Sequence, residues 1–306
     1  MATTTLPSIG FVGLGHMGLA MAVRLLDAGY EVYGVEGSRA RTHVLLHDRM
    51  QWCKTPHEIA DLADVMFTSL PDDAALESVA AGPDGILAGL AAGKIWADMS
   101  TVSPRASRAL SERVHALGAA MLDAPVSGSV PQVRAGVLTI MVGGDETAYT
   151  RVEPILRELG SPTHVGYNGQ GLALKLAINV SLAVQMLAFA EGLLLAERAG
   201  IDPALAAGIM TQSPIGSPVL KTRAPLVLDL PKEAWFDVAL MQKDLRLALD
   251  AARYLRVPLP STAVADQLLS TARDLGYEDR DIAVLFRVLS ELDVAPDNAA
   301  PGPASS

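Results

Sequence analysis

A glycine-rich turn near the N-terminus places the strongest constraint on how this chain can fold. The pattern G-x-G-x-x-G occurs at Gly13, Gly15 and Gly18. Alone it is weak, since glycine is common here (26 residues) and tight turns use it freely. Its context is specific, because an apolar run, Ile9–Gly13, precedes it, a helical pattern follows, and a second strand pattern comes next, Glu31–Val35. The segment therefore predicts a strand–turn–helix–strand unit.

Such a unit is typical of a site for the pyrophosphate of a dinucleotide. Its glycines let the backbone approach the phosphates, and the free N–H groups at the start of the helix stabilise their negative charge. We expect a cofactor-binding turn that consists of Gly13, Leu14, Gly15, His16, Met17 and Gly18.

A carboxylate at the end of the second strand bears on which dinucleotide binds. Glu36 follows Gly18 by eighteen residues (36 − 18), close to the spacing at which an acidic residue accepts hydrogen bonds from the adenosine ribose. The alternative is an ordinary solvated carboxylate at a strand end. A 2′-phosphate placed beside Glu36 would meet a like charge, whereas Arg39 and Arg41 follow closely. We expect NAD to be preferred, with NADP possible as the cofactor.

The first half of the chain alternates short apolar runs with helical patterns. Strands that are apolar on both faces predict a mainly parallel sheet covered by helices on both sides. The strands are expected at Ile9–Gly13, Glu31–Val35, Asp64–Leu70, Lys94–Met99, Ala119–Asp123 and Leu138–Val142. The fold class is therefore α/β, with an N-terminal doubly wound Rossmann-type domain followed by an all-α C-terminal domain.

The second half of the chain is helical in pattern. A long apolar helix is expected to end before Gly200, and Asp202-Pro203 starts the next one. Later helices are expected at Asp237–Tyr254, Thr262–Leu275 and Arg280–Leu292. We expect an NAD(P)-binding Rossmann domain over residues 1–166, an all-helical substrate and dimerisation domain over residues 167–295, and a flexible tail over residues 296–306.

Composition excludes several classes of protein. The formal net charge of −10 argues against a nucleic-acid backbone or an anionic membrane as a partner. Cys53 is the only cysteine, so an intramolecular disulfide and a thiolate metal site are both excluded, and we expect no metal. Lys175 and Glu191 bracket only fifteen uncharged residues, fewer than the roughly 20 that a bilayer needs. Residues Met1–Pro7 lack the pattern of a signal peptide, so a cytoplasmic location is expected.

Two further segments contain side chains suited to chemistry. In the turn D-A-P-V-S-G-S, Ser127 offers a hydroxyl beside backbone N–H groups at Gly128, which suits a carboxylate, although alone it would more often be an ordinary turn. Lys175 and Asn179 are four residues apart and share one face of the long apolar helix. A lysine there has two explanations of similar weight, a functional amine or a side chain that snorkels to water.

These segments together resemble the β-hydroxyacid dehydrogenase family, which includes 3-hydroxyisobutyrate dehydrogenase and tartronate semialdehyde reductase. The resemblance runs from Ile9 to about Leu292 and depends on the order and spacing of five blocks. The blocks are G-L-G-H-M-G, Leu70-Pro71, D-M-S-T at Asp98–Thr101, D-A-P-V-S-G with Gly143-Gly144 downstream, and G-x-G-x-x-x-K-x-x-x-N from Gly169 to Asn179.

The resemblance implies a role for each remaining candidate. Lys175 would be the catalytic acid/base with Asn179 beside it, and Ser127 with Gly128 would hold the substrate carboxylate. The cofactor would be contacted by Leu70, Pro71, Thr101, Phe236 and Lys243. The reaction would be reversible oxidation of a small 3-hydroxy acid, or reduction of the matching semialdehyde, by a homodimer or homotetramer.

Some positions depart from the family pattern. Ser129 stands where a second glycine is usual, so we expect it to contact the substrate and to alter which acid fits. Ile178 replaces one of the usual paired polar residues on the lysine helix, and Gly37 stands where NADP-using relatives often carry arginine. Two alternatives stay open: an imine-reductase-like enzyme, although those relatives lack this lysine, and a non-catalytic dinucleotide-binding reader or scaffold of the same fold.

Overall fold

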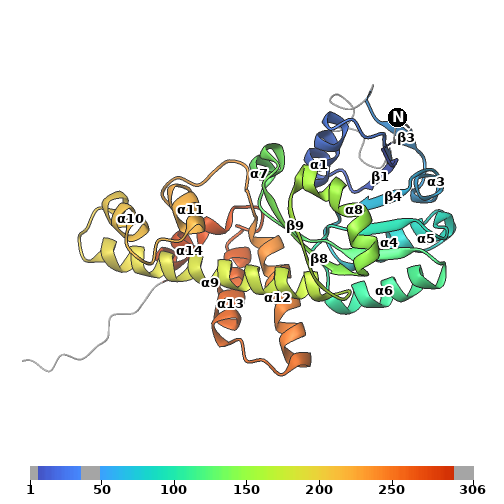
Figure 1. The fold of residues 1–306 in the computed structure, drawn as a ribbon. Helices are drawn as coiled ribbons and strands as arrows, with labels where there is room; N and C mark the ends of the chain where they lie inside the picture. The colour runs from blue at the N-terminus through green and yellow to red at the C-terminus, as the bar shows by residue number, and fades with distance from the viewer. Residues whose placement is uncertain (1–5, 36–48, 293–306) are drawn as a thin grey trace, which may run out of the picture. The chain divides into compact units, whose positions relative to one another are not determined.

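The computed structural model describes residues 6–35 and 49–292, which form two compact units. Unit 1 contains the chain up to Ser181 together with Leu240–Ala263, and unit 2 contains Leu182–Ala239 and the chain from Val264. Unit 1 is built around a single sheet (Figure 1). Its strands are β1 (Ile9–Val12), β2 (Val32–Val35), β3 (Gln51–Cys53), β4 (Val65–Thr68), β5 (Ile95–Asp98), β6 (Ala120–Asp123), β7 (Val126–Ser127), β8 (Leu138–Gly144) and β9 (Gly160–Gly166).

The strand order of the sheet is β3-β2-β1-β4-β5-β6-β8-β7, and β9 pairs with β8. All pairs from β3 to β6 are parallel, as is the pair of β8 with β9. β1 lies between β2 and β4, so the connections run in opposite directions from it, and an open α/β sheet binds its ligands at the carboxyl ends of the strands at such a point. The expected Rossmann-type domain is confirmed.

Helices cover both faces of this sheet. Side chains of α1 (His16–Asp27), α7 (Val130–Ala135) and α8 (Glu146–Leu159) pack with one set of strand residues. Side chains of four other helices pack on the opposite face of the sheet. These four are α3 (Pro56–Leu62), α4 (Asp73–Ala80), α5 (Ile86–Gly89) and α6 (Pro104–Ala116). Alternate residues of each strand point to opposite faces, so Phe67 packs with the first group and Met66 with the second.

The six strands expected from the sequence are present, but the sheet has further strands and is not parallel throughout. β6 and β7 both pair with β8 in antiparallel fashion. The short strands β3 and β7 have two or three residues each, too few for a pattern of alternation, and β9 carries Pro162 between its glycines. These strands form because a neighbouring strand offers backbone partners, which a local pattern does not show.

A long helix, α9 (Gln170–Arg198), contributes its first twelve residues to unit 1 and the rest to unit 2. In the described part of the chain it is the one helix long and apolar enough to cross a membrane by length and composition, and 44% of its most apolar stretch is buried. On this helix Leu174 is 42% exposed and Leu195 is 74% exposed, so two of its large apolar side chains lie on the surface.

The regular elements among the described residues of unit 2 are helices, apart from an isolated antiparallel bridge between Asp237 and Asp281. Unit 2 contains α10 (Pro203–Gln212), α11 (Pro218–Leu228), a short 3-10 helix, η1 (Ile282–Val284), and α14 (Leu285–Glu291), and it shares α12 (Val238–Leu255) and α13 (Pro260–Asp274) with unit 1. The buried Asp281 carboxylate accepts hydrogen bonds from Arg223 Nη1 (2.8 Å) and from the backbone N–H groups of Trp235 (2.9 Å) and Phe236 (3.1 Å). Unit 2 therefore has a charged anchor for the segment that carries Phe236.

Candidate active site

The three glycines of the first turn each have a separate structural reason. Gly13 has φ +94°, and a Cβ there would lie 2.3 Å from the Ser69 carbonyl oxygen. A Cβ at Gly18 would lie 1.9 Å from the Gly13 oxygen, so the helix can pack closely on the strand. Around Gly15 nothing lies within 4 Å of a Cβ, which leaves open space above the backbone. Tight turn, close packing and open approach are the three properties that a pyrophosphate site requires.

Other residues of the turn divide between the interior and the surface. Leu14 is buried, so a ligand can meet it only through its backbone, whereas Met17 is half-buried against the core and His16 is exposed. The N-cap of α1 is Gly15, which has no side chain of its own that could compete with an anion for the first N–H groups. The turn thus fits the phosphates of a dinucleotide.

A chain of hydrogen bonds holds the next two expected cofactor segments. The Leu70 N–H donates to Ser100 Oγ (2.9 Å), and that hydroxyl donates to Asp98 Oδ1 (2.5 Å). Thr68 Oγ1 donates to the same oxygen (2.7 Å) and accepts from Trp96 Nε1 (2.9 Å). Burial raises the pKa of Asp98, while the bonds from Ser100 and Thr68 oppose that rise. The ends of β4 and β5 are therefore fixed to each other before Thr101 is reached.

Lys243 connects the same two segments from α12. Its Nζ donates to the carbonyl oxygens of Pro71 (2.8 Å) and Thr101 (2.6 Å), and lies 3.0 Å from Asp244 Oδ1. Four of the expected residues, Leu70, Pro71, Thr101 and Lys243, are thus brought together in unit 1. The Lys243 ammonium is engaged by the protein itself, so its contribution to a ligand site is to shape the two loops.

Lys175 and Asn179 lie on α9 within the interior of unit 1. Lys175 is 9% exposed and Asn179 is 1% exposed. Asn179 Nδ2 donates to Asp244 Oδ2 at 2.5 Å, which connects α9 to α12. Burial lowers the pKa of Lys175 to about 8; the negative charge of Asp244 opposes this shift, and the positive charge of Lys243 adds to it. An amine with this pKa can both give and take a proton near neutral pH.

Asp244 belongs to this site although no role was expected for it. It is 3% exposed and contacts both Lys243 and Asn179. Met241, Leu245 and Ala248 of the same helix are also buried, so the helical period places this carboxylate on the inner face of α12. This helical period, together with the position of the acid next to Lys243, is the feature of the sequence that could have identified Asp244.

Asp123 connects the end of β6 to the start of α9. Its Oδ1 accepts from the Gly169 N–H (2.6 Å) and its Oδ2 from the Leu172 N–H (3.0 Å). Burial raises the pKa of Asp123 to about 7; these two hydrogen bonds oppose that shift, and the neighbouring Asp98 carboxyl adds to it. The strand that leads into the expected substrate turn is therefore bonded to the helix of Lys175.

In that turn, Ser127 belongs to the two-residue strand β7 and Gly128 has φ +134°, a conformation that favours glycine. A Cβ at Gly128 would also lie 2.7 Å from Leu138. Ser129 differs from its neighbours, because its N–H (3.0 Å) and its hydroxyl (2.7 Å) both donate to Gln132 Oε1. Both donors of Ser129 therefore serve the start of α7.

Two expected cofactor contacts lie outside the described residues of unit 1. Glu36, with Gly37, Arg39 and Arg41, lies outside the described residues. Phe236 belongs to unit 2, where Asp281 holds its backbone. Within the described ranges, 6–35 and 49–292, no cluster of three or more His, Cys, Asp or Glu side chains could hold a metal ion.

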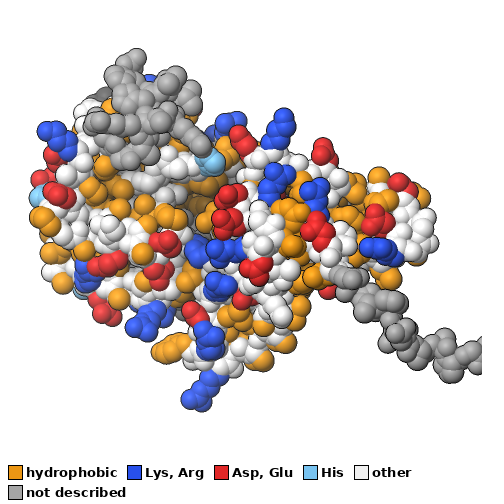
Figure 2. Space-filling view, turned by 180° about the vertical axis from the view of Figure 1, so that it is seen from behind, with side chains coloured by type: hydrophobic (Ala, Val, Ile, Leu, Met, Phe, Trp, Pro, Cys, Tyr) orange, Lys and Arg blue, Asp and Glu red, His pale blue; other side chains and the backbone are white. Residues whose placement is uncertain are grey.

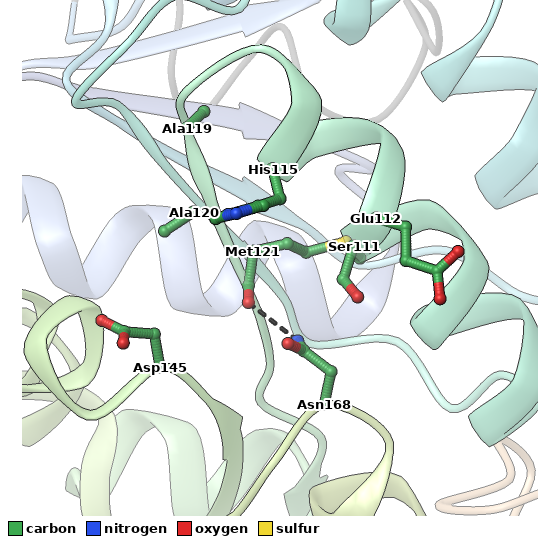
Figure 3. A pocket seen from close by; sticks show the side chains of 8 residues that line it. All are labelled: Ser111, Glu112, His115, Ala119, Ala120, Met121, Asp145 and Asn168. Carbon is green, nitrogen blue, oxygen red and sulfur yellow. Dashed lines mark hydrogen bonds between the residues drawn. The ribbon is translucent and has the colours of Figure 1, made fainter.

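A surface pocket of about 230 Å³ lies elsewhere on unit 1 (Figure 3). It is lined by residues of α6 and β6 together with Asp145 and Asn168, and none of the expected site residues lines it. The Asn168 side chain points to β6, where its Nδ2 donates to the Met121 carbonyl oxygen (2.8 Å). This bond is a second connection between β6 and the loop that leads into α9.

Two family models match the chain, and together they cover most of it. Residues 8–169 match the NAD binding domain of 6-phosphogluconate dehydrogenase. Residues 169–289 match the domain described as NAD-binding of NADP-dependent 3-hydroxyisobutyrate dehydrogenase. The first match contains the glycine turn and the second contains Lys175 and Asp244.

Relatives are similar over nearly their whole length. The 2-(hydroxymethyl)glutarate dehydrogenase of Eubacterium barkeri is 34% identical over 93% of this chain and 95% of its own. The 2-hydroxy-3-oxopropionate reductase of Escherichia coli is 34% identical over 92% of this chain and 96% of its own. A solved structure of Mycobacterium tuberculosis 3-hydroxyisobutyrate dehydrogenase with L-serine is 29% identical, with a TM-score of 0.82, and covers 93% of this chain and 99% of its own.

Proposed function

Because the chain belongs to the β-hydroxyacid dehydrogenase family, we propose that it transfers a hydride between NAD(P) and a small 3-hydroxy acid or the matching semialdehyde. The observation that carries the proposal is the buried amine of Lys175, with its pKa of about 8, beside the pair formed by Asn179 and Asp244. The Lys175 amine can therefore serve as both the proton acceptor and the proton donor of the reaction.

Lys175 is the acid/base of the proposed reaction. In oxidation its neutral amine takes the proton of the substrate hydroxyl, and in reduction its ammonium donates a proton to the carbonyl oxygen. Asn179 donates one N–H to Asp244, which holds its amide in one orientation. Its other N–H and its oxygen can then bind a substrate. Asp244 favours the charged form of Lys175 and so keeps the pKa from falling further.

A carboxylate in the substrate is proposed because of the turn at Ser127 and Gly128. The relatives are named for small hydroxy or oxo acids, which supports this class. Ser127 would donate its hydroxyl and Gly128 its backbone N–H to the anion. Ser129 stays a prediction as a third contact, and binding there requires its bonds to Gln132 to be exchanged.

The nicotinamide dinucleotide supplies the hydride chemistry, and the protein supplies placement and proton transfer. Gly13, Gly15 and Gly18 would hold its pyrophosphate, as the open backbone at Gly15 allows. The loops at Leu70-Pro71 and Thr101, which Lys243 connects, would flank its nicotinamide half. We propose a preference for NAD because of the carboxylate of Glu36, with NADP accepted to a lesser extent.

Two alternatives are separable by experiment. An imine reductase of this fold would not need Lys175, and a reader or scaffold would bind the dinucleotide without turnover. The test is formation of NADH with a panel of short 3-hydroxy acids, repeated in reverse with short semialdehydes and imines. Turnover of the acids that is lost in Lys175→Met supports the proposal. Imine turnover that survives the substitution, or binding of NAD without any turnover, would contradict it.

The proposed setting is the cytoplasm, as a homodimer or homotetramer. Support for self-association comes from large apolar side chains on the surface of unit 2, namely Leu195, Ile201, Leu205 and Ile209, each more than two-fifths exposed. Figure 2 shows acidic and basic side chains mixed with hydrophobic ones over the face that it draws. Neither nucleic acid nor a membrane is proposed as a partner.

A further inference from the structure

We propose that Asp123 is the positioning residue for Lys175. Its carboxylate holds the first turn of α9 at the end of β6, and the place of this turn decides where the Lys175 amine lies. The inference depends on the acid/base role proposed for Lys175, and it adds a residue that the reaction requires but that does not touch the substrate.

The Asp123 carboxylate binds two backbone N–H groups at the start of α9. Gly169 and Leu172 carry two of the N–H groups that a helix leaves without an internal partner at its N-terminus. Each is bound by a different oxygen of Asp123, at 2.6 and 3.0 Å. Because the two donors are three residues apart, the carboxylate spans the first turn. It therefore restrains both the position of this turn along the helix axis and its rotation about that axis. A partial negative charge is also favoured at this end of a helix.

Two glycines make the space that this carboxylate occupies. A Cβ at Gly143 would lie 2.8 Å from Asp123 Oδ1, and a Cβ at Gly171 would lie 2.9 Å from Oδ2. These glycines come from separate parts of the chain, β8 and α9. A Cβ would also lie 2.7 Å from the Tyr167 oxygen at Gly143 and 2.5 Å from the Met141 oxygen at Gly171, so the two glycines let the backbone close tightly around the Asp123 carboxylate.

The distance from this anchor to Lys175 is short. Leu172, whose N–H is bound, is fully buried and packs with the core residues Trp96 and Met121. Lys175 follows three residues later, which is about 4.5 Å along the helix axis at about 1.5 Å per residue. A shift of the first turn therefore moves the amine by a comparable amount.

Asp123 acts on Lys175 through the backbone and not as a charge. Its side chain is 0% exposed, and both oxygens are engaged by backbone N–H groups. The charges that shift the pKa of Lys175 are those of Asp244 and Lys243. Loss of a nearby negative charge would lower the pKa of a lysine, whereas exposure to water would raise it. The two effects have opposite signs, so one measurement separates them.

Asn168 provides a matched control. Its side chain ties the same loop to the same strand, through the Met121 oxygen, but it precedes α9 and binds none of the helix N–H groups (Figure 3). Asn168→Ala therefore loosens the loop and leaves the cap of α9 in place. Asp123→Asn keeps the shape of the side chain but removes its charge and one of its two acceptor oxygens.

The experiment is an NMR titration of the full-length protein labelled with ¹³C in its lysine side chains, with Lys175→Met to identify the signal. We expect Asp123→Asn to raise the pKa of Lys175 from about 8 towards its ordinary value of 10.5. In steady-state assays kcat should fall about 100-fold, the loss expected from a misplacement of about 1 Å, with little change in the dissociation constant for NADH. Asn168→Ala should change neither the pKa of Lys175 nor kcat.

An unchanged pKa and kcat in Asp123→Asn would overturn the inference, and so would an equal effect of Asn168→Ala. Should Asp123→Asn fail to fold, Asp123→Ser keeps one acceptor for one of the two N–H groups and should raise the pKa in the same direction. The titration needs no substrate. A raised pKa in a protein that turns over no hydroxy acid would therefore support the positioning role and reject only the proposed function.

Discussion

Asn179 of α9 donates a 2.5 Å hydrogen bond to Asp244 of α12, one helical turn beyond Lys175. The bond fixes the spacing between the helix that carries the amine and the carboxylate that acts on its pKa. Two opposing effects then determine the pKa of the Lys175 amine: burial lowers it, and the negative charge of Asp244 raises it. The proposed chemistry depends on their balance.

Replacement of the amine is the most direct test of the mechanism. Lys175→Met should lower kcat by about 10²- to 10⁴-fold, the usual contribution of a general acid/base, and should leave the dissociation constant for NADH almost unchanged. The matched control is Lys94→Met, since Lys94 is also a partly buried lysine of unit 1, but it lies just before β5, at the opposite end of that strand from Thr101. A Lys175→Met enzyme with much of its kcat intact would contradict the assignment.

The pH dependence should differ in sign between the two directions. Oxidation needs the neutral amine, so kcat/KM should rise with pH through an apparent pKa near 8. Reduction needs the ammonium, so kcat/KM should fall through the same pKa. Profiles measured in both directions check this. Parallel profiles, or a transition that persists in Lys175→Met, would show that another group titrates.

Recognition of the substrate carboxylate can be separated from catalysis. Ser127→Ala should lower kcat/KM for the best acid more than for its methyl ester, because a hydrogen bond to a charged group contributes about 1.5–3 kcal/mol. Ser129→Ala is the informative comparison, since both donors of Ser129 bind Gln132, and its effect on the acid should be smaller. Equal losses for acid and ester in Ser127→Ala would show that Ser127 does not bind the carboxylate.

The preference between cofactors is expected to depend on Glu36. The wild type should favour NAD over NADP by about tenfold in kcat/KM, which is about 1.4 kcal/mol. The double substitution Glu36→Ala with Gly37→Arg should lose or reverse that preference. Glu31→Ala serves as the control, because Glu31 precedes the same strand and its carboxylate binds the side chains of Gln51 and Tyr33. A wild type that prefers NADP would show that Arg39 or Arg41, and not Glu36, determines the cofactor preference.

Features that depend on neighbours in sequence could be predicted. The glycine turn at Gly13–Gly18 and the Lys175–Asn179 pair each need only local spacing, and six of the strands show their apolar runs directly. Contacts between distant segments could not be predicted in this way. Asp123 reads as the last residue of a strand, and its partner Leu172 is 49 residues away. Asp98 and Asp244 likewise acquire their roles only when β4 and α9 come beside them.

Ser129 has a contact that the family pattern does not reveal. Its contact with the substrate stays a prediction. Its hydroxyl and N–H both bind the side chain of Gln132, three residues later at the start of α7. A local capping interaction competes for the donors that the substrate would use.

The division of the chain between the two units has a consequence for recombination among relatives. Unit 1 is discontinuous, because it takes in the start of α9 and the segment Leu240–Ala263. A hybrid joined near residue 166 would bring α9 and α12 from a second parent. It would keep Lys175 with Asp244, yet the bonds from Asp123 to α9 and from Lys243 to the Pro71 and Thr101 loops would cross the joint. Exchange of either half between parents, in the laboratory or in evolution, must therefore preserve both sets of contacts.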